Sequence, residues 1–186
     1  MLTTQQTTTQ NILEHGISVH KYFNDLIGEN KLDWKLPDWF EEHKEFILNN
    51  LHKYDDIEEY QKMHDCGKPY CLYVDEEGRN HFPDHSNISS QVFSKISNNI
   101  IVKDLISKDM IFHTIRSEDL KNFIDKTSIE TVLTLLTTSF CELHSNANMF
   151  GGIKSQSFLI KLKKTSKLGK KTIHMIMDKN KKQKTK

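Results

Sequence analysis

Hydrophobic residues recur at helical spacing in separate segments along the first third of the chain. The first segment contains Ile12, Leu13, Ile17, Tyr22, Phe23, Leu26 and Ile27, and Gly28 ends it. Asp38, directly after Pro37, predicts an N-cap for a helix over residues 39–51. Asp55 or Asp56 predicts the cap of a third helix over residues 57–66.

The pattern changes once and then returns to helical spacing. Residues 70–82 contain two short apolar stretches around Asp75-Glu76-Glu77-Gly78, which predict a small hairpin or an ordered loop. Asp84 predicts the cap of the next helix, and further helices are expected over 102–115, 117–126 and 128–147. Residues 149–158 break the pattern before a lysine-rich amphipathic segment over 158–177. The fold class is therefore all-α.

Length and composition indicate a soluble protein with one main domain. Of the 186 residues, 36% are hydrophobic and 27% charged, and no apolar run approaches the roughly 20 residues of a membrane span. The Thr/Gln-rich residues 1–10 are expected to be a disordered tail without the features of a signal peptide, and 11–150 form the helical domain. Cys66, Cys71 and Cys141 are expected to be reduced in a cytoplasmic protein, with a Cys66–Cys71 bridge as the alternative.

Charge is distributed unevenly along the chain. Residues 154–186 contain twelve lysines and one aspartate, a net charge of +11, whereas residues 1–153 carry −10. The C-terminal extension 151–186 is expected to be helical first and disordered over residues 179–186. Its lysines either contact a nucleic acid or form a solvated end.

The segment His64-Asp65-Cys66-Gly67-Lys68-Pro69 carries the chemistry. It joins an imidazole to a carboxylate at the end of a predicted helix, and Gly and Pro then end that helix. This pair of ligands suits Mn²⁺, Fe²⁺, Ni²⁺, Co²⁺ or Mg²⁺ better than a structural zinc ion. His15, His85 and His113 also lie in or beside predicted helices, which is what a metal site inside a helix bundle needs. Each of these histidines has the alternative of an ordinary surface or hydrogen-bonded core residue.

Residues 63–96 resemble the HD-domain metal-dependent phosphohydrolases. The likeness is greatest to the HD domain of bacterial tRNA nucleotidyltransferases, whose pattern HD-x-GKP, then Phe and GHE, reads here as 64–69, Phe82 and Asp84-His85-Ser86. The resemblance implies an HD-type helical bundle with His15 as the first metal ligand, followed by His64 and Asp65. His85 and His113 then complete that site or hold a second ion.

The resemblance also implies a last ligand, an Asp on a long apolar helix. The corresponding helix here contains no Asp, and His144 or Asn146 occupies that region. His144 offers a nitrogen and Asn146 a neutral oxygen, so either ligand leaves the site one negative charge short.

A metal-activated water would hydrolyse a phosphate ester in such a site, as a phosphodiesterase or phosphatase does. Asp65 is expected to accept a proton from that water. Lys68 is expected at the pocket rim, where it reaches a substrate phosphate. The substrates implied are a nucleotide or an RNA end. The alternative is a catalytically idle HD fold that acts as a nucleic-acid or protein-binding adaptor.

Overall fold

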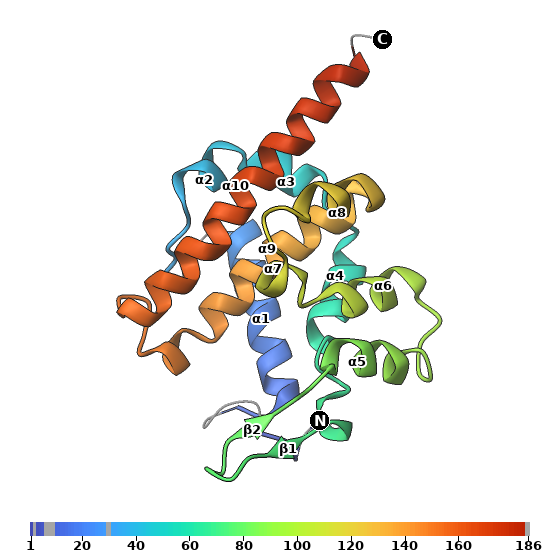
Figure 1. Cartoon of the computed structure of the whole chain (residues 1–186), viewed down its shortest axis with the longest axis vertical. Coiled ribbons are helices and arrows are strands. Elements are labelled where there is room, and N and C mark those ends of the chain that lie inside the picture. The colour runs from blue at the N-terminus through green and yellow to red at the C-terminus, as the bar shows by residue number, and fades with distance from the viewer. Residues whose placement is uncertain (2, 6–9, 29–30, 185–186) are drawn as a thin grey trace. The chain divides into compact units, whose positions relative to one another are not determined.

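The computed structural model describes residues 1, 3–5, 10–28 and 31–184, with side chains as far as Lys181. The described chain is mostly helical with one small two-stranded hairpin (Figure 1). It divides into two compact units, the first containing residues 1–24 and 53–110, and the second residues 25–52 and 111–186. The mostly helical class expected from the sequence is confirmed.

The first unit contains α1 (Ile12–Ile27, except its last turn), α4 (Tyr54–Met63), α5 (His85–Phe93), α6 (Ile100–Lys108) and the short 3-10 helix η1 (Lys68–Tyr70). A reciprocal capping box begins α1: Glu14 N–H donates to Asn11 Oδ1, and Asn11 N–H donates to Glu14 Oε2. Helix α6 packs on α4 and α5. The core that they enclose includes Ile57, Tyr60, Phe93, Val102, Leu105 and Ile106.

One local expectation for this unit is corrected. Helix α4 has Lys53 at its N-cap, and Asp55 and Asp56 lie in its first turn, where their charges interact favourably with the helix dipole without capping it. In the described part of residues 1–10, for which a disordered tail is expected, Thr4 O accepts Ile12 N–H and Gln5 pairs with Asn11. Residues 2 and 6–9 lie outside the described part of the chain.

The expected hairpin is present as β1 (Tyr73–Val74) and β2 (Asn80–His81), with Tyr73 opposite His81. The Asp75 carboxylate organises its turn. Oδ1 accepts the backbone N–H groups of Glu77 and Arg79, and Oδ2 accepts Arg79 Nε–H and lies 2.7 Å from His81 Nε2. The hydrogen bond with His81, then that from the Arg79 backbone, lowers the pKa of Asp75 to about 2.

We therefore expect the turn to loosen only in strong acid. The Asp75 pKa is lower in the folded chain (about 2) than its ordinary value of 3.8. The contacts of the carboxylate thus stabilise the turn above about pH 4 and are lost as the pH falls through about 2. Carbon-13 NMR of the Asp75 carboxyl measures this directly, and Asp75→Asn removes the signal as a control. Titration near 3.8 would contradict the described contacts.

The second unit contains α2 (Asp38–Glu42), α3 (Lys44–Asn49), α7 (Ile111–Thr114), α8 (Leu120–Lys126), α9 (Ile129–Ser145), the 3-10 helix η2 (Ala147–Phe150) and α10 (Gln156–Lys184). Ser128 caps α9 by accepting Thr131 N–H, and residues 131–144 of that helix are all buried. Helix α10 packs on α9 and α8. Gly169 lets α10 lie close to α2 and α9, because a Cβ there would lie 2.6 Å from the Trp39 ring and 3.1 Å from Leu136 Cδ1.

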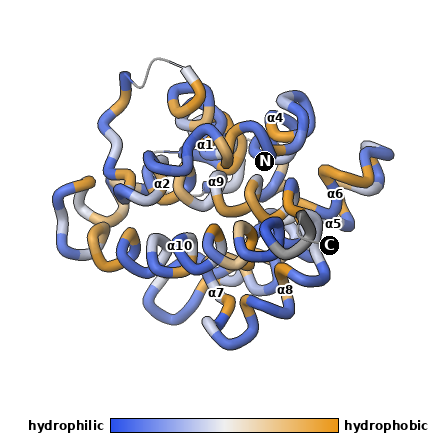
Figure 2. The backbone as a smooth tube through the Cα atoms, turned by 90° about the horizontal axis from the view of Figure 1, so that it is seen from above, coloured by the Kyte–Doolittle hydropathy of each residue, from blue (hydrophilic) through white to orange (hydrophobic). Residues whose placement is uncertain are grey.

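Several helix boundaries in this unit differ from the sequence expectations. The helix expected over 39–51 is two helices separated at His43, and residue 38 begins α2 after an N-cap at Pro37. The segment expected as one helix over 102–115 is split into α6, of the first unit, and α7. Helix α10 runs for 29 residues to Lys184, with hydrophobic and hydrophilic positions interspersed along it (Figure 2), so residues 179–184 are helical where disorder is expected. Residues 185–186 lie outside the described chain. Among the described helices, none is long and apolar enough to cross a membrane.

Candidate metal centre

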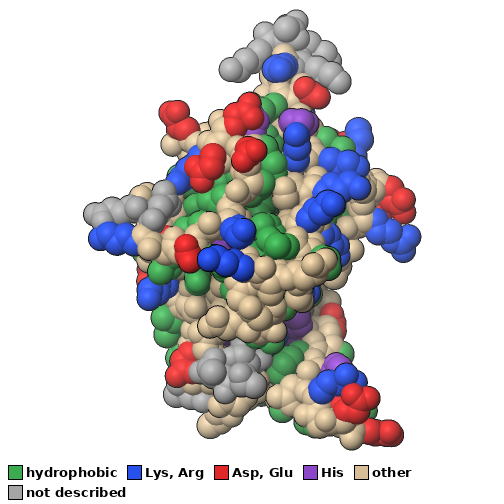
Figure 3. Space-filling view, turned by 90° about the vertical axis from the view of Figure 1, so that its left-hand side faces the viewer, with side chains coloured by type: hydrophobic (Ala, Val, Ile, Leu, Met, Phe, Trp, Pro, Cys, Tyr) green, Lys and Arg blue, Asp and Glu red, His purple; other side chains and the backbone are tan. Residues whose placement is uncertain are grey.

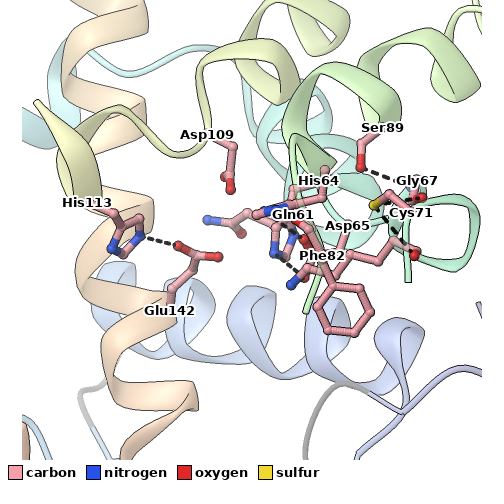
Figure 4. Close-up of polar contacts among 12 residues, drawn as sticks. Gln61, His64, Asp65, Gly67, Cys71, Phe82, Ser89, Asp109, His113 and Glu142 are labelled. Atoms are coloured by element: carbon pink, nitrogen blue, oxygen red, sulfur yellow. Dashed lines mark hydrogen bonds and ion pairs between the residues drawn. The ribbon is translucent and has the colours of Figure 1, made fainter. Parts of the chain in front are cut away.

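The His64-Asp65 pair lies where α4 ends in the first unit. His64 is the C-cap residue of α4, and both side chains are buried, at 1% and 2% exposure. The chain then turns through Gly67 against the backbone of α5 (Figure 4). Gly67 N–H donates to Ser89 Oγ, and a Cβ on Gly67 would lie only 2.3 Å from Ser89 N. Glycine is therefore required for space, since its φ of −86° is ordinary.

A second glycine brings α1 close to the same place. A Cβ on Gly16 would lie 2.7 Å from Lys62 O and 2.8 Å from Gln61 O, at the end of α4. This approach places the buried His15 next to His64, with ring centroids 5.4 Å apart and an edge-on arrangement. Two glycines thus bring three elements of the first unit together around one cluster of polar side chains.

Backbone carbonyls orient two of the imidazoles. His64 Nδ1 lies 2.8 Å from Gln61 O, and His85 Nδ1 lies 3.0 Å from Phe82 O. A carbonyl oxygen can only accept a hydrogen bond, so the ring nitrogen beside it must be the donor. The neutral form of each ring therefore carries its proton on Nδ1 and has its lone pair on Nε2. Those Nε2 atoms lie 3.3 Å and 3.7 Å from the two oxygens of Asp65. Such hydrogen bonding of the remote nitrogen is how proteins orient metal-binding histidines.

Asp65 is ionised at the centre of this cluster. Burial by itself raises the pKa of the carboxyl group, but His64 and then Lys68 outweigh it, so the pKa lies well below 3.8. Within the described chain, buried Oδ1 has no hydrogen-bond partner. Burial, and then the charge of Lys68, lowers the pKa of His85, which favours the neutral ring that a metal ion needs.

Lys68 lies elsewhere than the sequence predicts. Its side chain is buried rather than at a pocket rim, and Nζ donates to Asp65 Oδ2 over 2.6 Å. Nζ also lies 5.2 Å from the centroid of the Phe82 ring. Lys68 therefore offsets the charge of Asp65 in the structure as it stands.

The other candidate ligands from the sequence, His113, His144 and Asn146, lie in the second unit. His113 Nε2 is 2.8 Å from Glu142 Oε2 (Figure 4). His144 uses both ring nitrogens on backbone groups, since Nε2 accepts Lys35 N–H and Nδ1 lies 2.7 Å from Phe140 O. Asn146 follows the last turn of α9, and its Oδ1 is buried without a hydrogen-bond partner among the described residues.

Each unit contains buried side chains that could bind a metal ion. His15 and His64 lie in the first unit and Glu142 in the second, and all three are buried. Glu142 is the residue that the sequence interpretation passed over, because it sought an Asp and considered only His144 and Asn146 as substitutes. The signal available was a carboxylate inside the most apolar helix of the chain, where a lone charge is costly.

The donor set suits a divalent ion. It combines the imidazole nitrogens of His15, His64 and His85 with the Asp65 carboxylate, and Asp65 Oδ1, which has no hydrogen-bond partner in the described chain, is a buried acceptor that a cation satisfies. No protein-family model, curated protein or solved structure matches the chain.

Proposed function

We propose that the chain is a metal-dependent phosphohydrolase of the HD type that hydrolyses a phosphate ester of a nucleotide or an RNA end. The observation that carries the proposal is the buried His64-Asp65 pair, with a carboxylate oxygen that has no hydrogen-bond partner among the described residues and imidazoles oriented by backbone carbonyls. An ordinary core rarely contains such an oxygen, because a buried acceptor without a hydrogen bond destabilises a fold. The arrangement is accounted for if a divalent ion belongs there.

In this proposal His15, His64 and Asp65 hold the ion, and His85 assists from the start of α5. When bound, the ion supplies Lewis acidity and lowers the pKa of water. Asp65 Oδ1 accepts a proton from the attacking water, since this oxygen is not occupied by Lys68. Lys68, whose Nζ lies beside Asp65, stabilises charge on the phosphate.

A position beside His85 also supports the HD-type proposal. Asp84 stands where the family pattern has glycine, and its φ of 53° lies in the left-handed region that glycine favours. The backbone before His85 thus adopts a conformation suited to the glycine of that pattern. The nucleotide or RNA-end substrate rests on the family resemblance and on the lysine-rich C-terminus.

The first test is metal content together with hydrolysis. We expect the purified chain, stripped with EDTA and reloaded with Mn²⁺ or Ni²⁺, to retain one or two ions and to hydrolyse bis(p-nitrophenyl) phosphate. His64→Ala should lose the ion and the activity. His174→Ala removes an exposed histidine and should change neither. Mass spectrometry of the metal content and the release of p-nitrophenol give both readouts.

The failure of this test is equally clear. A chain that retains none of Mn²⁺, Fe²⁺, Co²⁺, Ni²⁺ or Mg²⁺ and hydrolyses no phosphodiester or phosphomonoester would not be a hydrolase of this kind. Equal metal loss in His64→Ala and His174→Ala would show binding outside the proposed centre.

A catalytically idle adaptor is the second candidate. The observation that favours it is the Lys68–Asp65 ion pair at 2.6 Å, which neutralises the carboxylate without a metal. Helix α10 also presents exposed lysines, and Lys and Arg side chains gather on the upper right of Figure 3, where a polyanion would bind. In the adaptor, nucleic-acid affinity falls steeply with salt, and metal content and hydrolysis are absent.

A further inference from the structure

The second unit has its own pocket, built on α7, α9, η2 and α10. Its volume is about 160 Å³, and its polar lining consists of His113, Glu142, Asn146, Lys161, Lys164 and Thr165. Phe112, Leu143 and Phe150 form the apolar part of its wall. Each of these residues belongs to the second unit, so the pocket is formed without any residue of the Asp65 cluster in the first unit.

The charges of this pocket favour an anion. Glu142 is its one carboxylate, and His113 already partners it at 2.8 Å. Two ammonium groups remain, from Lys161 and Lys164 on successive turns of α10. Lys164 Nζ is held by one hydrogen bond to His113 O, and Lys161 Nζ lies 4.8 Å from the centroid of the Phe150 ring. Each ammonium keeps further N–H donors for a ligand.

Asn146 contributes a hydrogen-bond acceptor to the pocket, whereas the two lysines contribute donors. Its Oδ1 atom is buried at the pocket wall, and the described residues provide no hydrogen-bond donor for it. Buried amide oxygens are normally satisfied, so this atom indicates a ligand that brings an O–H or N–H group. An inorganic anion without such a group satisfies the lysines and leaves Asn146 as it is.

We propose that this pocket binds a small phosphate monoester that carries a hydroxyl or amino group. The phosphate lies between Lys161 and Lys164, and the hydroxyl or amine donates to Asn146 Oδ1. Thr165, buried on the same face of α10, lines the pocket beside the phosphate. The site goes beyond the proposed hydrolase activity because none of these contacts requires a metal ion.

Calorimetric titration of the full chain with glycerol 3-phosphate tests the proposal, with inorganic sulfate, which has no O–H group at neutral pH, and glycerol as comparison ligands. We expect glycerol 3-phosphate to bind more tightly than sulfate and glycerol not to bind. The double variant Lys161→Ala/Lys164→Ala should weaken the binding at least tenfold. Lys163→Ala/Lys167→Ala removes the same charge from exposed positions outside the pocket and should change the affinity less than twofold.

Asn146→Leu separates the two halves of the proposed ligand. It should weaken glycerol 3-phosphate binding about fivefold and leave sulfate binding unchanged. Equal affinity for sulfate and glycerol 3-phosphate, or equal losses in the two lysine double variants, would overturn the proposal.

All titrations are run in EDTA and repeated with Asp65→Asn/Lys68→Met, which removes the Asp65 carboxylate without leaving the buried Lys68 charge unpaired and so separates this pocket from the proposed metal centre. Binding that persists under both conditions supports the pocket whether or not the chain is a hydrolase. Binding that disappears in either would mean that the ligand is held by a metal ion or by the Asp65 cluster, and the pocket proposal would be wrong.

Discussion

Asp65→Asn is expected to abolish metal binding and hydrolysis while leaving the shape of the side chain unchanged. The amide removes the negative charge to which Lys68 is paired and against which the Nε2 atoms of His64 and His85 lie. Altering a residue that only orients a ligand costs about 10–100-fold in metal affinity, and we expect the loss of a direct ligand to exceed that. Isothermal titration with Mn²⁺ measures the change.

The same substitution should also lower stability, for a reason unrelated to metal. Lys68 is 6% exposed, so Asp65→Asn leaves a buried ammonium without its carboxylate. Breaking a buried pair from one side costs about 3–5 kcal/mol. The double variant Asp65→Asn/Lys68→Met removes the stranded charge and should recover most of that loss in the metal-free protein.

Metal binding should not recover in the double variant. This difference separates a metal ligand from a residue that is only structural. If Asp65 were only structural, replacing both Asp65 and Lys68 would restore metal affinity as well as stability. Metal affinity in the double variant equal to that of the unmodified chain would remove Asp65 from the centre.

Gly67→Ala is expected to destabilise the first unit by about 3 kcal/mol or more, because overpacking against a rigid neighbour is costly. The added Cβ would lie 2.3 Å from Ser89 N and 2.6 Å from Ile88 C. These are backbone atoms inside α5, which cannot rotate away as a flexible side chain can. The melting temperature should fall by on the order of 10 °C, which differential scanning calorimetry measures.

Gly78→Ala provides the comparison. Gly78 has a φ of +75°, but nothing lies within 4 Å of a Cβ built there, so its replacement costs only the conformational term of about 1 kcal/mol. We also expect Gly67→Ala, and not Gly78→Ala, to weaken Mn²⁺ binding, because α5 carries His85. A melting temperature of Gly67→Ala within 2 °C of the unmodified chain would refute the close packing of this turn.

Local features of the fold could be predicted from the sequence because they depend on neighbouring residues. The spacing of apolar residues from Ile12 to Ile27 predicts α1, and the Asp-Glu-Glu-Gly stretch at 75–78 predicts the hairpin turn. Helix ends were harder to predict, because more than one acidic residue near the start of a helix could be its N-cap. Asp55 and Asp56 lie in the first turn of α4 instead of at its cap, and His43 interrupts a helix that its pattern predicts as continuous.

The candidate centre could be predicted from sequence only where its residues are adjacent. His64 and Asp65 are neighbours, so their closeness is independent of the fold. The other residues of the centre come together through the close backbone contacts at Gly67 and Gly16. These contacts join distant parts of the sequence, so they cannot be predicted from the spacing of hydrophobic residues. His15 and His85 join the cluster through these approaches.

Only the tertiary structure decided which partner each buried polar side chain has. Lys68, expected at a rim, is buried against Asp65, because the backbone turns between these two residues and Lys68 N–H donates to Asp65 O. The two nitrogens of His144 are held by Phe140 O and by Lys35 N–H, more than a hundred positions away, whereas Glu142 on the same helix pairs with His113. Residue type and helical phase are local properties of a sequence, whereas the partner of a buried polar group is set by the packing of the whole chain.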